Sequence, residues 1–265
     1  MVASLHGSLV FLGFLLAVTL PLPATAGDDE DAALYRMVLD GKLKGSEELL
    51  RGGARADKVR GDYGETALIQ AAGMGHTSLV RSLLQYGADP DARDRQGFTP
   101  LLRALRSGQT VAALELIKHK TVDLGAVDHG GNTALHRACQ SPSDRHCVRQ
   151  LIQEKVPLEP RNLQGWTPLH ACARYGRMYG ATYLLDAGVG IDVTDAEGYT
   201  PLHRAAMLGH QKMVEKLVAS GARTDLRAVD GNTALDIAKL LLQEATAAWL
   251  EANSQPGGDA KKEEL

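Results

Sequence analysis

A short motif, Thr followed by Pro or Ala and then Leu, recurs along this chain of 265 residues at an almost constant interval. Its copies begin at Thr66, Thr99, Thr133, Thr167, Thr200 and Thr233, which are always 33 or 34 residues apart. Self-similarity at such a period indicates stacked helical units, each of which buries apolar surface only against its neighbours. The period therefore predicts a solenoid rather than one globular core, and it favours a function in recognition over one in catalysis.

Each period has the same internal layout. A turn with Gly comes first, as in Asp94-x-x-Gly97, and the motif Thr is well suited to cap the helix that follows. Three copies place Pro in the first helical turn, where its missing N–H costs nothing. A second helix with apolar spacing then ends at a residue such as Gly87. We therefore expect an all-α chain of helix-turn-helix units joined by short turns or hairpins.

These motifs resemble the ankyrin repeat, whose signature is Thr-Pro-Leu-His-x-Ala. The resemblance extends over about residues 31–253, which is most of the chain. It implies that His136, His170 and His203, which follow the motif Leu, hydrogen-bond within and between repeats. It also implies a binding module with no cofactor, and we expect it to be a monomer.

The repeats divide the chain into five parts. We expect a signal peptide over 1–26, a degenerate capping repeat over 27–64 and five ankyrin repeats over 65–231. A capping unit over 232–253 and a flexible tail over 254–265 follow. No Gly or Pro interrupts Thr233 to Asn253, which predicts one long helix with Trp249 covering the open end of the stack.

Both ends of the chain carry sequences that resemble targeting signals. An apolar run is followed by Ala24-Thr25-Ala26, a pattern typical of a secretory signal peptide that is cleaved after Ala26. An uncleaved anchor and a misassigned start codon are the alternatives, because no Lys or Arg precedes the run. The last four residues resemble the endoplasmic-reticulum retrieval signal Lys-Asp-Glu-Leu: Lys262, Glu263, Glu264 and Leu265. Together they predict retention in the lumen through a retrieval receptor, with secretion as the alternative and no membrane insertion after cleavage.

Composition and motifs exclude several functions. The net charge of −3 argues against a general nucleic-acid binder. The phosphate-binding loop, the zinc-protease helix and the serine-nucleophile elbow have no matching sequence, so we expect no enzyme.

The three Cys fall at motif positions where small or apolar core residues are expected, which favours buried thiols. A sharper alternative is a Cys139–Cys147 disulfide, because these two Cys flank a loop with one extra residue. A zinc site built from these Cys and the neighbouring His is disfavoured, since no ligand pairs recur at zinc-site spacing. We therefore expect no metal.

The resemblance places partner binding on the concave side, which turn tips and first helices form. The residue before each motif Thr and those seven and eight after it lie there, and the residues four after it are expected to be half exposed. Aromatic and Arg side chains dominate binding hot spots. The candidate contact residues are Phe98, Arg103, Arg106, Arg137, Trp166, Arg174, Tyr175, Tyr199, Arg204 and Met207. We expect Trp166 and Tyr199 side by side, flanked by Arg137 and Arg204, in a mixture that suits an acidic or extended peptide segment.

The sequence thus predicts a non-enzymatic scaffold or adaptor of the endoplasmic-reticulum lumen that binds another protein. Two alternatives stay open: a secreted protein that acts outside the cell, and a thiol or redox protein that uses its Cys residues.

Overall fold

The structure is a computed structural model, and it describes residues 26–142 and 144–253. These residues form fourteen helices and no strand. The helices are α1 (Ala26–Leu39), α2 (Leu43–Arg51), α3 (Ala67–Met74), α4 (Thr77–Gln85), α5 (Pro100–Arg106), α6 (Thr110–Ile117), α7 (Ala134–Gln140), α8 (Asp144–Gln153), α9 (Pro168–Arg174), α10 (Met178–Asp186), α11 (Pro201–Met207), α12 (Gln211–Ala219), α13 (Ala234–Leu240) and α14 (Glu244–Asn253).

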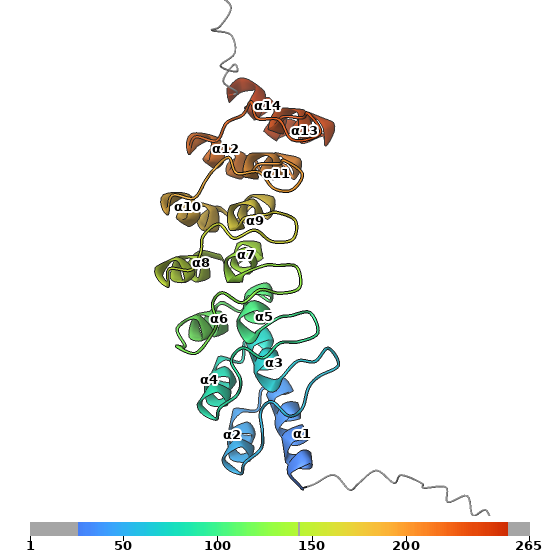
Figure 1. The fold of residues 1–265 in the computed structure, drawn as a ribbon, viewed down its shortest axis with the longest axis vertical. Helices are drawn as coiled ribbons and strands as arrows, with labels where there is room; N and C mark the ends of the chain where they lie inside the picture. The colour runs from blue at the N-terminus through green and yellow to red at the C-terminus, as the bar shows by residue number, and fades with distance from the viewer. Residues whose placement is uncertain (1–25, 143, 254–265) are drawn as a thin grey trace, which may run out of the picture.

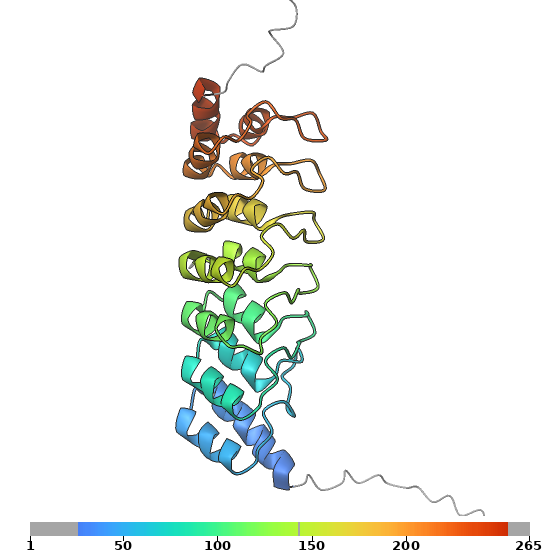
Figure 2. The same ribbon diagram turned by 60° about the vertical axis from the view of Figure 1, so that its left-hand side comes forward.

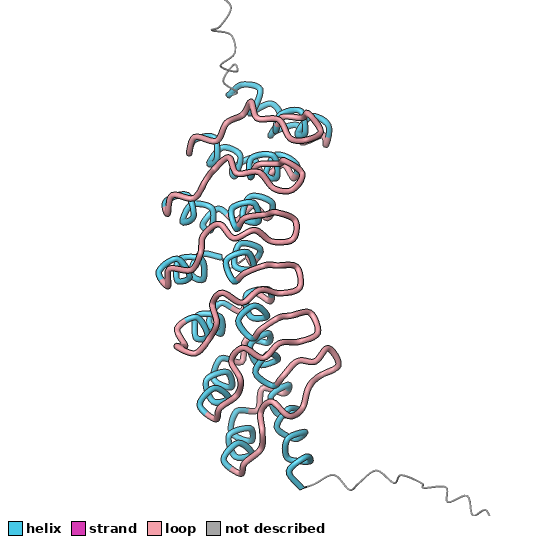
Figure 3. The backbone as a smooth tube through the Cα atoms, in the orientation of Figure 1, coloured by secondary structure: helices cyan, strands magenta, loops and turns pink. Residues whose placement is uncertain are grey.

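The helices stack as pairs in two columns. The odd-numbered helices pack against one another in chain order, and the even-numbered helices form the second column beside them (Figure 1). The loops that join one pair to the next all project from the same side of the stack, as Figure 2 shows. Figure 3 confirms the all-helical solenoid that the period predicts.

The motif Thr begins the first helix of each unit from α3 onward. In the copy at Thr200, the Thr200 Oγ1 accepts a hydrogen bond from the N–H of His203 at 3.4 Å, while the Thr200 N–H donates to His203 Nδ1 at 3.2 Å. Such caps satisfy helix N–H groups that have no partner within the helix, and each stabilises by about 1 kcal/mol. Helices of seven to nine residues, which are marginal alone, need these caps and tertiary packing.

Small side chains let the first helices pack closely. Ala71, Ala104, Ala138 and Ala205 are fully buried between successive first helices. Leu side chains of the second helices, such as Leu83, close the core from the other column. This alternation of small and large residues produces one continuous core along the stack.

The loop tips are joined by one backbone hydrogen bond between successive units. The N–H of Arg95 donates to the carbonyl of Tyr63 at 2.8 Å, and the N–H of Leu163 donates to that of Gly130 at 3.1 Å. Within a loop, the N–H of Asp94 donates to the carbonyl of Phe98 at 3.1 Å, which gives the hairpin shape. The tips are therefore held in register although the described residues contain no strand.

The last pair differs from the expected single helix. Chain 233–253 forms two helices, α13 and α14, which a turn at Leu242 separates. Leu242 has a φ of 56°, and it occupies the position that Gly209 holds in the preceding unit with a φ of 66°. The repeat geometry thus imposes the break without the expected Gly. Trp249 is partly buried and packs against the core, as expected.

Candidate functional site

The residues before each motif Thr and at positions seven and eight after it define what we call the motif face. The first helices and the loops before them carry these residues, so the face runs along one side of the stack (Figure 1). In the N-terminal half it comprises Glu65, Gly73, Met74, Phe98, Arg106, Ser107, Asn132, Gln140 and Ser141. In the C-terminal half it comprises Trp166, Arg174, Tyr175, Tyr199, Met207, Leu208, Asn232, Leu240 and Leu241.

Three Arg residues beneath this face are held by Asp residues of the preceding turn. Arg137 Nε donates to Asp128 Oδ2 at 2.6 Å and Arg204 Nε donates to Asp195 Oδ2 at 2.7 Å. Arg103 pairs in the same way with Asp94. Burial alone raises the pKa of Asp128, but hydrogen bonds from Arg137 and Asn132 hold it below its usual value. These guanidinium groups therefore stabilise the fold through ion pairs within the chain.

The turn Asp has a second role in shaping the loop. Asp128 Oδ1 accepts from the N–H of Gly130 at 2.8 Å and from that of Asn132 at 3.1 Å. Asn162 stands at the same place in the next unit and makes the turn bonds, and its Nδ2 donates to Asn132 Oδ1 at 2.9 Å. The residue nine positions after Asn162 is Ala171, so the unit that lacks the Asp also lacks the Arg.

This pairing is a structural feature of the site that the sequence interpretation missed. Asp and Arg stand nine residues apart in the three units that contain either of them, and the spacing is visible in the sequence alone. A recurring Asp–Arg spacing would have identified these Arg residues as structural.

Phe98 is buried rather than available on the face. Only 2% of it is exposed, and the guanidinium carbons of Arg103, Arg106 and Arg137 lie 4.8, 4.8 and 4.9 Å from its ring centroid. Arg137 therefore contacts Phe98 and does not flank Trp166 as expected. Burial, together with the charges of Arg137 and Arg103, lowers the pKa of Arg106.

The expected contact between Trp166 and Tyr199 is mediated by Arg204. Its guanidinium carbon lies 5.1 Å from the Trp166 ring centroid and 4.6 Å from that of Tyr199. Arg204 itself is 6% exposed, and the side chains of Arg103 and Arg137 are 21% and 15% exposed, so all three are less exposed than the half exposure expected of them. The guanidinium carbon of Arg174 also lies near this ring, 5.3 Å from the Trp166 centroid. In the described part of the chain no carboxylate comes within ion-pair distance of Arg174.

The last three units carry exposed apolar residues at one position of the face. Tyr175, Leu208 and Leu241 occupy the position eight after their motif Thr, and they are 42%, 42% and 44% exposed. The same position holds Met74, which is 46% exposed, in the unit of Thr66, and Ser107 and Ser141 in the two units after it. Exposed apolar residues that gather in one row mark an interaction surface more often than single exposed ones do.

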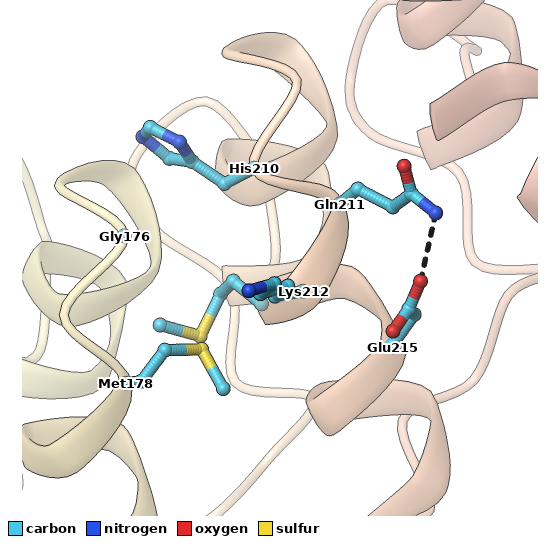
Figure 4. Close-up of a pocket in the computed structure, with 7 residues that line it drawn as sticks. Gly176, Met178, His210, Gln211, Lys212 and Glu215 are labelled. Atoms are coloured by element: carbon cyan, nitrogen blue, oxygen red, sulfur yellow. Dashed lines mark hydrogen bonds between the residues drawn. The ribbon is translucent and has the colours of Figure 1, made fainter. Parts of the chain in front are cut away.

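An open cavity of about 450 Å³ lies beside this row, between the starts of α10 and α12 (Figure 4). Its lining consists of Gly176, Met178, His210, Gln211, Lys212, Met213 and Glu215. The His210 ring bonds the carbonyl of Arg174 at 2.9 Å, which fixes one wall to the end of α9. Gln211 Nε2 donates to Glu215 Oε1 at 2.8 Å.

The motif His residues link each unit to the next, as the resemblance implies. His170 Nδ1 accepts from the Thr167 N–H at 3.1 Å, and its Nε2 bonds the carbonyl of Tyr199 at 3.0 Å. This arrangement requires a neutral ring with the proton on Nε2, and burial lowers the pKa of His170 to about 4. Burial also lowers the pKa of His136 and His203.

The favoured prediction of three buried free thiols is wrong for Cys139 and Cys172, and the alternative, a Cys139–Cys147 disulfide, is wrong as well. The disulfide joins Cys139 to Cys172, in the successive first helices α7 and α9, with their Cα atoms 4.6 Å apart. Cys147 is buried in α8 and takes no part in it. The expected burial of all three sulfur-bearing residues is confirmed. Because both bridged Cys are fully buried, the geometry favours a structural bond over thiol exchange.

No cluster of three or more His, Cys, Asp or Glu side chains suited to a metal ion occurs among residues 26–142 and 144–253. Over the same residues, no helix has the length and apolar character that crossing a membrane requires. The predicted signal peptide, apart from Ala26, and the predicted tail with Lys262 to Leu265 lie outside the described residues.

The comparisons with known proteins agree with this architecture. The family description "Ankyrin repeats (3 copies)" matches residues 34–128, 113–196 and 180–256. The human SH3 and multiple ankyrin repeat domains protein 2 is 32% identical over 150 residues, which are 57% of this chain and 8% of that protein. This chain thus spans less than a tenth of that relative's length.

Two solved structures share the fold. The human ASB11 ankyrin repeat domain has a TM-score of 0.73 at 24% identity, over 84% of this chain and 98% of that one. The ankyrin repeat domain of Bcl-3 has a TM-score of 0.65 at 26% identity, over 79% of this chain and 96% of that one. Ankyrin repeats act as protein–protein interaction modules and are typically non-enzymatic. On the strength of the family match over most of its length, this chain belongs to the ankyrin-repeat family.

Proposed function

We propose that this chain is a non-enzymatic binding module of the endoplasmic-reticulum lumen, which holds an extended acidic segment of another protein on its motif face. The observation that carries this proposal is the gathering of Trp166, Arg174, Tyr175 and Met207 in the C-terminal half of that face. These side chains are half-buried or exposed, and no carboxylate of the described chain pairs with Arg174. An aromatic ring beside a cation suits a carboxylate-bearing peptide.

A luminal location fits the chemistry of the Cys residues. A disulfide between buried Cys is typical of proteins that fold in an oxidising compartment, and it is rare in the cytosol. The cleavage-like Ala24-Thr25-Ala26 sequence and the Lys262-to-Leu265 ending provide entry and retrieval. The disulfide is equally compatible with secretion. Retrieval to the endoplasmic reticulum is therefore the step that distinguishes this proposal from secretion.

The binding proposal is tested by affinity purification from a luminal fraction with the parent protein and with Trp166→Ala. Alanine at a hot-spot aromatic costs about 2 kcal/mol of binding or more, so a true partner should be depleted about thirtyfold with the variant. A thermal melt is the control, since Trp166 is only partly buried and the variant should remain folded. Equal recovery of every partner by both proteins would contradict binding through this face.

The location is tested by removing the last four residues from an internally tagged chain. We expect the parent protein to stay inside the cell with a mature N-terminus at Gly27, and the shortened chain to appear in the medium. Parent protein that accumulates in the medium would favour secretion, and cytosolic protein that retains Met1 would contradict both addresses.

A further inference from the structure

The second column of helices is open at one place. Neighbouring helices of this column contact one another along the stack, but α10 and α12 make fewer contacts than any other such pair. The cavity of about 450 Å³ lies at this place. Its volume falls within the range of roughly 300–1,000 Å³ that is typical of ligand-binding clefts.

The interior of the cavity suits a large apolar side chain. Met178 and Met213 line it, and Figure 4 labels Met178 at the start of α10. Methionine is flexible and polarisable, so it adapts its shape to an inserted aromatic or aliphatic group. The exposed Tyr175 directly precedes Gly176 of the cavity wall, so apolar surface continues from the cavity onto the motif face.

The rim carries one cation and one anion, Lys212 and Glu215, and no ion pair within the described ranges includes either of them. The carboxylate of Glu215 accepts from the neutral Gln211 amide at 2.8 Å. Lys212 is exposed, whereas Glu215 is half-buried. An apolar cavity beside an exposed ammonium group is complementary to a peptide that carries an apolar and an acidic side chain close together, and Glu215 disfavours an acidic side chain on its own side of the rim.

We propose that the cavity between α10 and α12 anchors the bound segment, taking one large apolar side chain while an acidic side chain two residues away pairs with Lys212. In an extended chain, residues i and i+2 point to the same side about 6.6 Å apart, which lets both groups reach one site. This inference rests on the proposed function and specifies the peptide sequence that it recognises.

The test is a selection from a random twelve-residue peptide library displayed on phage, with the purified full-length protein in its disulfide-bonded form as the target. We expect enrichment of an aromatic, Leu or Met residue with Asp or Glu two positions away. Enriched peptides should bind Lys212→Glu at least about tenfold more weakly, because attraction becomes repulsion. The matched control is Lys216→Glu, which makes the same change one turn further along α12 and should leave the affinity unchanged.

Two further variants complete the test. Met178→Glu places a charge in the cavity lining at the first position of α10, where an acidic residue is compatible with the helix, and it should abolish binding. A peptide whose acidic residue is replaced by Lys should recover its affinity for Lys212→Glu.

The outcomes separate the two proposals. Peptides that lose affinity for Trp166→Ala but bind Lys212→Glu and Met178→Glu like the parent would overturn the cavity as anchor and leave the motif face as the site. A library from which no peptide is enriched would overturn this inference, and if affinity purification also recovers no partner, the proposed function fails with it.

Discussion

Arg residues four and seven positions after the motif Thr contact the aromatic rings of the face in different ways. Four positions after it, Arg103 and Arg137 contact Phe98 and Arg204 contacts Trp166 and Tyr199, and each of these three Arg residues pairs with the Asp of its own turn. Seven positions after it, Arg106 contacts the buried Phe98 and Arg174 contacts the partly buried Trp166, and among the described residues neither Arg has a carboxylate within ion-pair distance. An aromatic–Arg pair is therefore a binding candidate only where the repeat does not supply the counter-charge itself.

A large effect, similar in size to loss of the disulfide, is expected where the counter-charge of Arg137 is removed. Asp128→Ala leaves Arg137 half-buried without its partner and removes two turn hydrogen bonds, so unfolding should be easier by about 3 kcal/mol. Urea denaturation measures this change. Asp128→Asn, which keeps the turn acceptor but not the ion pair, should lose less; equal losses would show that the turn hydrogen bonds add nothing, and an Asn variant as stable as the parent would show that the ion pair adds nothing.

The disulfide comes next, since it joins α7 in one half to α9 in the other. It closes a loop of 33 residues, for which the chain-entropy estimate is about 3–4 kcal/mol. Replacing Cys139 and Cys172 by Ala should lower the stability by about that amount and let the two halves unfold in separate transitions. Cys147→Ala is the control, because this buried residue lies outside the bridge. A single, unshifted transition in the double variant would contradict the linking role.

Lowering the pH should reduce the stability of the C-terminal half before it reduces that of the N-terminal half. The motif His is present in the units of Thr133, Thr167 and Thr200, whereas Ile69 and Leu102 stand there in the two preceding units. With a folded pKa of about 4 for His170 against 6.5 for the unfolded chain, the unfolded state binds the extra proton between these values, and stability falls as the pH falls. At pH 5 the loss for His170 is about 2 kcal/mol.

Hydrogen exchange at pH 7 and pH 5, corrected for the intrinsic rate, locates this loss. Protection should fall in α9 and α11 before it falls in α3 and α5. A uniform decrease along the stack would contradict an origin in the His residues.

The smallest expected effect is a gain in stability. Leu242 adopts a φ of 56° while 81% of its surface is exposed, so it is strained and contributes little burial. Leu242→Gly should therefore stabilise the last pair by about 1 kcal/mol, which a thermal melt detects. A loss of stability would show that the Leu242 side chain packs more than its exposure indicates.

The sequence predicted the fold better than it predicted the contacts made by the surface side chains. The motif period is sufficient for the helix pairs, because each unit needs only its neighbours to bury its core. The break at Leu242 was not predicted, since the signal used was Gly and the stack imposed the turn on another residue. The Cys139–Cys172 pairing was missed because proximity was sought within one unit, whereas close packing brings together residues 33 apart on successive first helices.

The sequence predicted which residues form the motif face, but it did not predict which of their charges are paired within the chain. Sequence positions identify which side chains belong to the motif face, and Trp166, Arg204 and Tyr199 do meet there. They do not show whether a guanidinium has a counter-charge, which depends on the turn five residues before the motif Thr. Reading Asp94, Asp128 and Asp195 together with the Arg four residues after each Thr would have separated the Arg residues that have a counter-charge from Arg106 and Arg174, which stand seven residues after the Thr.

The most direct test of the difference between the two Arg positions, four and seven residues after the motif Thr, is a paired measurement of stability and binding on Arg137→Ala and Arg174→Ala. The first should lose about 2–3 kcal/mol of stability, because buried Asp128 is left without its partner, and its folded form should bind an enriched acidic peptide like the parent. The second should keep its stability within about 0.5 kcal/mol and bind at least about tenfold more weakly. The same result for both variants in stability and in binding would contradict the account.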